Sequence, residues 1–367
     1  MKLKPNKIHL TMIALGFFVF QSVFVNSSGQ AESLDLKNFS EISKPMGFQT
    51  HYAEYVTSKK NTVKIAILGS SFQSYDVELG KTIPSGTVFH TPPLPADEGE
   101  EDSLSQHGLY MAQLLVKLMT DNNQKKELEP ELHLFPYVYK YSNFKWAIEE
   151  AIKQKVDIIL YSTVKDFGGN NDGKGFINSL VNKALDAGIL WVNAAGNYGQ
   201  TTYNASIETV TGDWVKLPGP NNTVGIECKP IRDLKECHLR LTLSWNDFKD
   251  NTDVGTDKDL DLVLSDDALN IFENNRGALI QKKDPKSEET GVSKYPREII
   301  EINLKEGLYF ARIKNMSHNF SSRDQLRLVG DGDGISFVQS NREESLLNPA
   351  DNAGVITVGA TDTDKSS

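Results

Sequence analysis

Between residues 63 and 195, short apolar segments alternate with amphipathic segments of helical period, and this alternation constrains the fold more than any other feature. Residues 63–68 and 156–161 are apolar enough for buried strands, whereas residues 108–119 gather apolar side chains on one helical face. This order of elements predicts a parallel sheet with helices on both faces. The expected strands are residues 63–68, 132–135, 156–161 and 189–192, and the expected helices are residues 108–119, 144–154 and 176–187.

After Asn197 the pattern changes to short segments in which apolar and polar residues alternate with period two. They are residues 238–245, 259–264, 298–302, 307–313 and 325–328. Such strands, separated by polar turns, predict a β-sandwich. An apolar strand of the earlier type returns at residues 354–360 and needs a sheet to join. We therefore expect an α/β fold that is interrupted by an inserted, jelly-roll-like β-sandwich and incomplete at its C-terminal end.

The N-terminus has the layout of an export signal. Lys2, Lys4 and Lys7 precede an apolar run at residues 8–25, and a polar stretch then leads to small residues ending at Ala31. We expect cleavage after Ala31, no membrane span thereafter, and a secreted or periplasmic protein of a bacterial cell envelope. The alternative is a membrane anchor, for which the run is near the lower length limit.

These patterns give a division of the whole chain. We expect a signal peptide in residues 1–31, an N-terminal segment in residues 32–58, the first part of the α/β domain in residues 59–200, the inserted sandwich in residues 201–343 and the return strand in residues 344–367. The formal net charge is −10, which disfavours a nucleic-acid partner because phosphate binding needs a concentrated basic surface.

The two cysteines, Cys228 and Cys237, lie at the edges of strand-like segments. In an exported chain this placement favours a disulfide that closes a short hairpin. Zinc is the weaker interpretation, because two cysteines and a neighbouring His238 fall short of four ligands.

Three short motifs carry the chemistry of the α/β region. They are His107-Gly108, the run of residues 193–197 that ends in Ala-Gly-Asn, and Pro349-Ala350 followed by the strand at residues 355–360. In order and context they resemble the subtilisin family of serine peptidases, the subtilases. The matching segments are residues 63–79, 107–115, 156–162, 184–197 and 348–361. An unrelated α/β domain, such as a nucleotide-binding domain, is the alternative.

The resemblance implies roles for single residues and a polypeptide as substrate or ligand. His107 is the counterpart of the general base, which takes the proton of the nucleophile. Gly108 leaves room beside it for substrate backbone, and Ser162 begins the substrate-lining segment. Asn197 is the counterpart of the oxyanion donor, a contact typically worth ~3 kcal/mol of barrier. Without its flanking helix, His107 would be interpreted as an ordinary surface histidine.

Two catalytic residues of the family are not found where the resemblance places them. Gly69 stands at the position of the catalytic Asp, and Asp76 lies too far along the chain to replace it. Ser366 and Ser367 fall before the position of the family's nucleophile segment. Losing the carboxylate of a triad typically costs about 10⁴ in kcat. We therefore expect a truncated, degenerate subtilase homologue without peptidase activity.

Several origins and uses of such a chain stay open at this point. A broken reading frame, a cut fragment and a small natural pseudo-enzyme all fit the sequence. The functional alternative is a non-catalytic secreted or surface protein whose β-sandwich contacts protein or glycan. We expect no cofactor apart from calcium, for which the sequence offers Asp253, Asp257, Asp259 and Asp261 as oxygen ligands. Such a run is more often a solvated loop.

Overall fold

The computed structural model describes residues 62–94, 106–121, 130–136, 138–231, 234–266, 279–280 and 294–360. The expected signal peptide, the segment at residues 32–58 and the two C-terminal serines lie outside these residues. The chain divides into two compact units. The α/β unit comprises Met1–Val164, Leu180–Ala195 and Ala353–Ser367, and the sandwich unit comprises Lys165–Ser179 and Gly196–Asn352.

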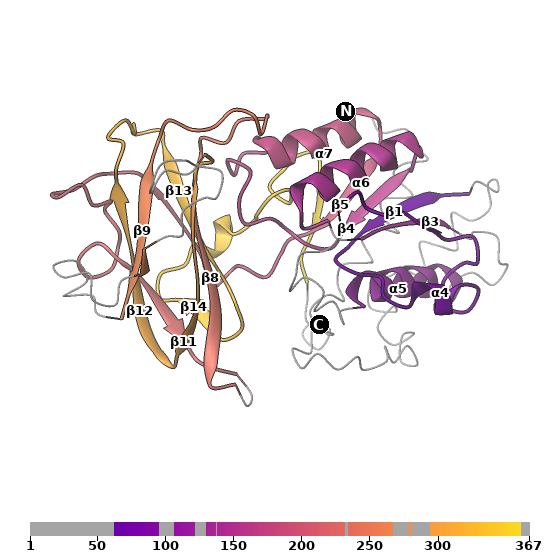
Figure 1. The fold of residues 1–367 in the computed structure, drawn as a ribbon, viewed down its shortest axis with the longest axis horizontal. Coiled ribbons are helices and arrows are strands. Elements are labelled where there is room, and N and C mark those ends of the chain that lie inside the picture. Colours follow the sequence, from indigo (N-terminus) through magenta and orange to yellow (C-terminus); the bar gives the residue numbers. More distant parts are fainter. Residues whose placement is uncertain are drawn as a thin grey trace. The chain divides into compact units, whose positions relative to one another are not determined.

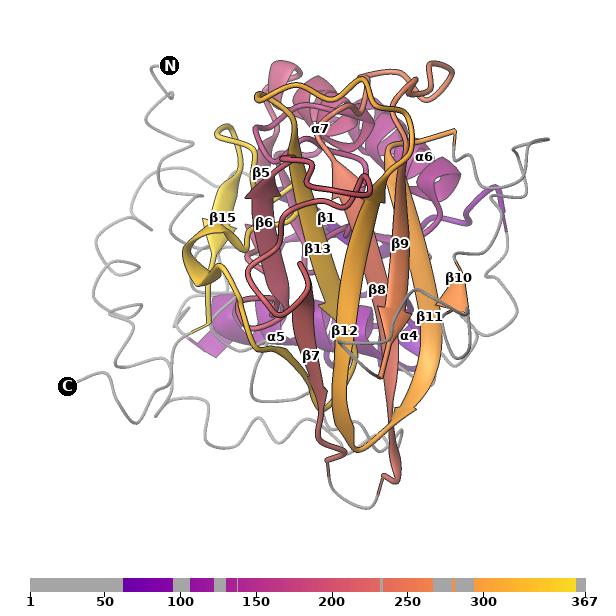
Figure 2. The ribbon, with the colours of Figure 1, turned by 90° about the vertical axis from the view of Figure 1, so that its left-hand side faces the viewer.

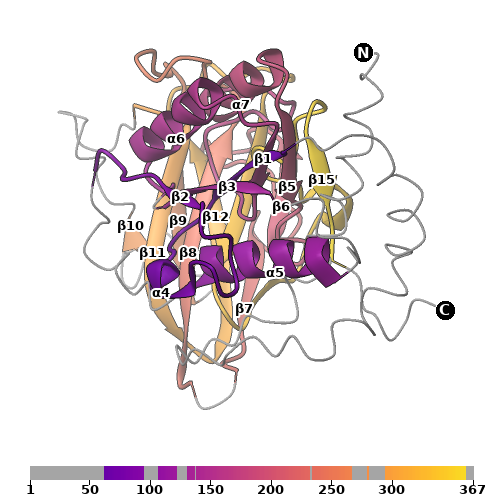
Figure 3. The same cartoon turned by 90° about the vertical axis from the view of Figure 1, so that its right-hand side faces the viewer.

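A six-stranded parallel sheet forms the centre of the α/β unit, in the order β15-β5-β4-β1-β3-β2. Its strands are β1 (Lys64–Leu68), β2 (Val88–Phe89), β3 (Glu131–Phe135), β4 (Ile158–Tyr161), β5 (Leu190–Ala194) and β15 (Ile356–Val358). The helices are α4 (Tyr75–Glu78), α5 (His107–Asp121), α6 (Tyr141–Lys153) and α7 (Phe176–Asp186), the last of which begins in the sandwich unit. Helix α5 covers one face of the sheet, and α6 and α7 cover the other (Figures 1 and 3).

Alternation along each strand sends side chains to both faces, so both faces are buried. On the α5 side, Ile65 and Leu132 pack with Leu115 in one apolar cluster. On the other side, the ring of Phe144 from α6 contacts that of Trp191 edge to face, with 6.1 Å between centroids. Because both faces of the sheet are buried, successive residues of each strand are apolar.

The sandwich unit contains two antiparallel sheets, with the orders β10-β9-β12-β7-β14 and β11-β8-β13-β6 (Figure 2). Its strands are β6 (Thr202–Ser206), β7 (Val224–Cys228), β8 (Glu236–Trp245), β9 (Leu260–Ser265), β10 (Leu279–Ile280), β11 (Arg297–Lys305), β12 (Gly307–Asn315), β13 (Gln325–Asp331) and β14 (Ile335–Phe337). Inward residues of both sheets, such as Ile226 and Leu241, belong to one apolar core. A short 3-10 helix, η4 (Arg342–Glu344), follows β14.

The predicted fold class is confirmed: a parallel sheet flanked by helices, interrupted by a β-sandwich. Strand β15 pairs in parallel with β5, with Thr357 opposite Asn193, so the last described strand returns to the α/β sheet. Among the described residues, no helix is long and apolar enough to span a membrane.

Residues 165–179 lie with the sandwich unit, whereas the sequence places them in the first part of the α/β domain. Hydrogen bonds account for the difference. The side chain of Asn170 donates to the carbonyl of Phe248 at 2.9 Å and accepts from its amide at 2.8 Å. The amide of Gly175 donates to the carboxylate of Asp250 at 3.0 Å. These partners are more than 70 residues away along the chain, so local patterns do not reveal them.

Candidate functional site

His107 is the first residue of α5 and is partly buried. Burial lowers the pKa of its imidazole, because a charged ring loses hydration there. The position at a helix N-terminus acts in the same direction, since the positive end of the helix dipole disfavours a cation. The ring is therefore neutral at pH 7 and can accept a proton, as a general base must.

Gly69 directly follows β1 and lies against the start of α5. Its amide donates to the carbonyl of Phe135 at 3.0 Å. A Cβ atom added at Gly69 would lie 3.2 Å from the Cα of Gly108 and 3.3 Å from the Cζ of Phe72. A side chain at position 69 would therefore project toward the first turn of α5, beside His107. Glycine supplies no group there.

Gly108 is required by close packing in the protein itself. Its amide donates to the carbonyl of Ser71 at 3.0 Å, and an added Cβ would lie 2.6 Å from that oxygen and 2.8 Å from the ring of Phe72. From the sequence alone, this glycine is predicted only to leave room for substrate backbone. Phe72 is 3% exposed and covers both glycines, a role that no periodic pattern indicates.

The carboxyl ends of β4, β5 and β15 meet at one edge of the sheet. Asn193 is fully buried and donates from Nδ2 to the carbonyl of Thr163 at 3.0 Å, while its Oδ1 accepts from Trp191 Nε1 at 3.0 Å. The amide of Ala195 donates to the carbonyl of Val358 at 2.9 Å. Ser162, just before Thr163, is buried. Asn193 therefore fixes the strand ends that carry the predicted substrate-lining residue.

Asn197 follows Gly196, whose φ of 86° lies in the left-handed region that favours glycine. The Asn197 side chain is exposed, and the residue belongs to the sandwich unit, whereas His107 belongs to the α/β unit. Its role as an oxyanion donor and its predicted position near His107 stay predictions.

The four aspartates proposed for calcium differ in their surroundings. Asp253 and Asp257 are exposed, whereas Asp259 and Asp261 are partly buried. Burial and the charge of Asp261 raise the pKa of Asp259 to about 6. Burial also raises the pKa of Asp261, and Lys314 opposes that shift. In the described part of the chain, no three or more carboxylate, imidazole or thiol groups come together to hold a metal ion.

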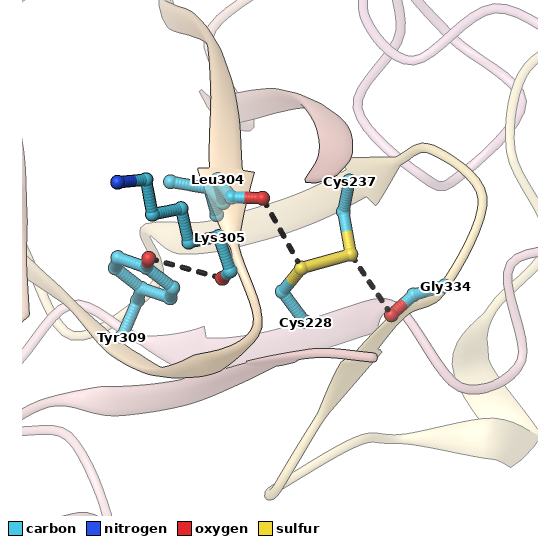
Figure 4. The surroundings of a disulfide bond; sticks show 6 residues. All are labelled: Cys228, Cys237, Leu304, Lys305, Tyr309 and Gly334. Carbon is cyan, nitrogen blue, oxygen red and sulfur yellow. Dashed lines mark hydrogen bonds between the residues drawn. A yellow bond between two sulfur atoms is a disulfide. The ribbon is translucent and has the colours of Figure 1, made fainter. Parts of the chain in front are cut away.

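Cys228 and Cys237 are joined by a disulfide with an S–S distance of 2.06 Å (Figure 4). Cys228 ends β7, where it pairs with Gly307 and Ile335 of the five-stranded sheet. Cys237 lies on β8 and pairs with Leu304 of the four-stranded sheet. The expectation of a hairpin is wrong, because the bond links the two sheets of the sandwich. The weaker interpretation, zinc binding, does not hold while the disulfide is intact, because the two sulfur atoms are bonded to each other.

The subtilase family model matches residues 60–227. This confirms the predicted resemblance: residues 60–227 are subtilase-like, and they contain Gly69 and His107. No curated protein matches the chain.

Two solved structures show only distant likeness. The prenylagaramide maturation protease PagA is 17% identical, with a TM-score of 0.28, over 42% of this chain and 52% of the protease. This chain thus spans about half the length of that protease. The pre-peptidase C-terminal domain of a collagenase from Bacillus anthracis is 12% identical, with a TM-score of 0.19, over 38% of this chain and 96% of that domain.

Proposed function

We propose that the protein is an exported subtilase homologue that binds polypeptides but does not hydrolyse them. The observation that carries the proposal is Gly69. Within the region that matches the subtilase family, this residue directly follows β1 and faces the first turn of α5, which begins with His107. The place from which a carboxylate would reach the imidazole is therefore occupied by a residue without a side chain.

The missing carboxylate affects the two states of the histidine differently. In a Ser-His-Asp triad the carboxylate holds the neutral imidazole in one tautomer and then stabilises the imidazolium that forms during the reaction. Burial at His107 already disfavours the imidazolium, as its lowered pKa indicates. Gly69 offers no carboxylate to offset this cost, and loss of that triad carboxylate is expected to remove about 10⁴ in kcat even where a nucleophile is supplied.

Packing makes the substitution at position 69 difficult to reverse. A Cβ built at Gly69 lies 3.2 Å from the Cα of Gly108 and 3.3 Å from the ring of Phe72, so any side chain there requires these groups to shift by a few tenths of an ångström. We infer that the local structure is adapted to glycine at this position. Restoring the aspartate alone is therefore not expected to restore activity.

Peptide binding and export complete the proposal. Binding needs no triad, and the strand ends that carry Ser162 are held in place by Asn193. The disulfide between Cys228 and Cys237 supports export, because such bonds persist in oxidising compartments. Both statements are inferences from these features and from the sequence of residues 1–31.

The test is hydrolysis of casein and chromogenic peptides by the purified polypeptide, with an active subtilase as positive control. We expect the wild type, Gly69→Asp and His107→Ala to be indistinguishable from buffer. Fluorescence anisotropy of a labelled casein digest then measures binding, which is expected for the wild type. Hydrolysis by the wild type that His107→Ala abolishes would overturn the claim of inactivity.

A further inference from the structure

A row of hydrogen-bonded side chains lies on β3 and at the end of β2, and the proposed function does not use it. Oε1 of Glu131 lies 3.1 Å from Nε2 of His133, and Nδ1 of His133 lies 2.9 Å from Nε2 of His90. Lys64 on β1 contacts Glu131 at 3.0 Å. His133 is 2% exposed, and His90 stacks on Phe135 with 4.2 Å between ring centroids.

The hydrogen bonds among Glu131, His133 and His90 determine which ring nitrogens carry a hydrogen at neutral pH. The hydrogen bond from Lys64 lowers the pKa of Glu131, so the carboxylate is ionised and can only accept. Nε2 of His133 must therefore carry a proton, which leaves Nδ1 of the neutral ring as an acceptor. His90 then donates from its Nε2, and the contact between the two rings is an ordinary hydrogen bond.

The first and the second added proton have opposite effects on this contact. A proton on Nδ1 of His90 leaves the Nε2 donor in place and strengthens the hydrogen bond, because the donor is then charged. When both rings are protonated, Nε2 of His90 and Nδ1 of His133 each carry a hydrogen. Two N–H groups would then face each other across 2.9 Å on two cationic rings, and the contact cannot persist.

Burial and neighbouring charged groups shift the pKa of His90. Burial and the charge of His133 lower the pKa of His90, Lys153 on α6 acts in the same direction, and Glu150 on α6 opposes them. On the strands, the charged groups next to His133 are Glu131 and, through its ion pair with Glu131, Lys64. Because the pKa of His90 is lowered, protonation of its ring requires acid below the ordinary imidazole range of about pH 6.5.

The segment held by this contact is residues 88–94, which we term the edge segment. Strand β2 pairs only with β3 in the described sheet, and the amide of His90 donates to the carbonyl of Leu134 at 3.0 Å. The far end is held at Leu94 by Asn143, which exchanges two hydrogen bonds with its backbone at 3.0 and 3.2 Å. Between these two anchors, the hydrogen bond between the two imidazoles and the stacking of His90 on Phe135 attach the edge segment to β3 through side chains.

We propose that His90 and His133 form an acid-operated latch: the ring-to-ring hydrogen bond holds the edge segment on β3, and protonation of both rings releases it. The ring of Phe89 contacts that of Phe72 edge to face, with 6.5 Å between centroids. Phe72 in turn covers Gly69 and Gly108, so release loosens the packing at the start of α5. The latch does not depend on the proposed function.

Hydrogen–deuterium exchange of the full-length protein tests the latch. Peptides covering residues 88–94 are followed at pH 7.5 and pH 5.0, with correction for the intrinsic exchange rate. We expect protection to fall by about tenfold or more at the lower pH. In His90→Phe, which keeps a ring on Phe135 but removes the titrating donor, protection should be independent of pH. His238→Asn in the sandwich removes another imidazole and should leave the wild-type transition unchanged.

A second variant covers the case in which His90→Phe does not fold. Glu131→Gln removes the negative charge that lies 3.1 Å from Nε2 of His133, so it should move the transition of the edge segment to lower pH. Unchanged protection of the wild type between pH 7.5 and 5.0 would overturn the latch. A transition that stays the same in His90→Phe, or in Glu131→Gln where His90→Phe is not folded, would also overturn it.

Discussion

Removal of the disulfide in the sandwich should destabilise that unit by an amount that follows from its loop. Cys228 and Cys237 are nine residues apart, so the bond closes a loop of about ten residues, and the loss of chain entropy in the unfolded state corresponds to about 2.7 kcal/mol. Both side chains are fully buried, so a double replacement by alanine keeps the site apolar and adds only a small cavity cost. We expect Cys228→Ala with Cys237→Ala to lose about 2–4 kcal/mol.

Differential scanning calorimetry measures this loss directly. For a domain of this size about 2–4 °C of Tm corresponds to 1 kcal/mol, so a loss of about 2–4 kcal/mol should lower the Tm of the sandwich transition by about 4–16 °C. Mass spectrometry of non-reduced protein purified from the periplasm should show a peptide linked through Cys228 and Cys237. A Tm change below about 2 °C, or two free thiols in that sample, would refute the reasoning.

Three further predictions concern single side chains. Arg327→Ala should lower the free energy of unfolding of the sandwich in urea by about 3–5 kcal/mol, because Arg327 is 5% exposed and its guanidinium donates to Asn204 and to two backbone carbonyls. Replacement of the exposed Arg323 by alanine should change the same free energy by less than about 0.5 kcal/mol. Asp259 has a raised pKa in the folded state, so its ionisation should cost wild-type stability as pH rises from about 4 to 6, and Asp259→Asn should flatten that part of the stability profile. Gly69→Asp should lower the free energy of unfolding, measured by thermal unfolding, by about 1–3 kcal/mol because its Cβ contacts Phe72. Gly69→Ala adds the same Cβ without a charge, so the difference between the two variants gives the electrostatic part of the loss.

The elements of the α/β unit could be predicted closely because each has a local signal. The expected helix at residues 176–187 corresponds to α7 at Phe176–Asp186, and the expected strand at residues 63–68 corresponds to β1 at Lys64–Leu68. Apolar periodicity over a dozen residues is enough to indicate such elements. The sandwich could be predicted for the same reason, since period-two alternation marks strands with one buried face.

Contacts between distant segments could not be predicted in this way. The sequence places Cys228 and Cys237 beside strands but does not show that the two strands enter different sheets, which is why the hairpin interpretation failed. His90 and His133 are 43 residues apart, and only the presence of a histidine inside an apolar strand at position 133 was a signal. Phe72 gave no signal, because its importance comes from two glycines that pack under its ring.

Labelling with a fluorophosphonate probe tests the central claim most directly, because the probe reacts with a serine only when a functioning base activates it. The purified protein is incubated with the probe beside an active subtilase, and intact-mass spectrometry measures the labelled fraction. With Gly69 beside His107, the chain should show no labelling above a heat-denatured control. Stoichiometric labelling of any serine, lost in His107→Ala, would contradict the account.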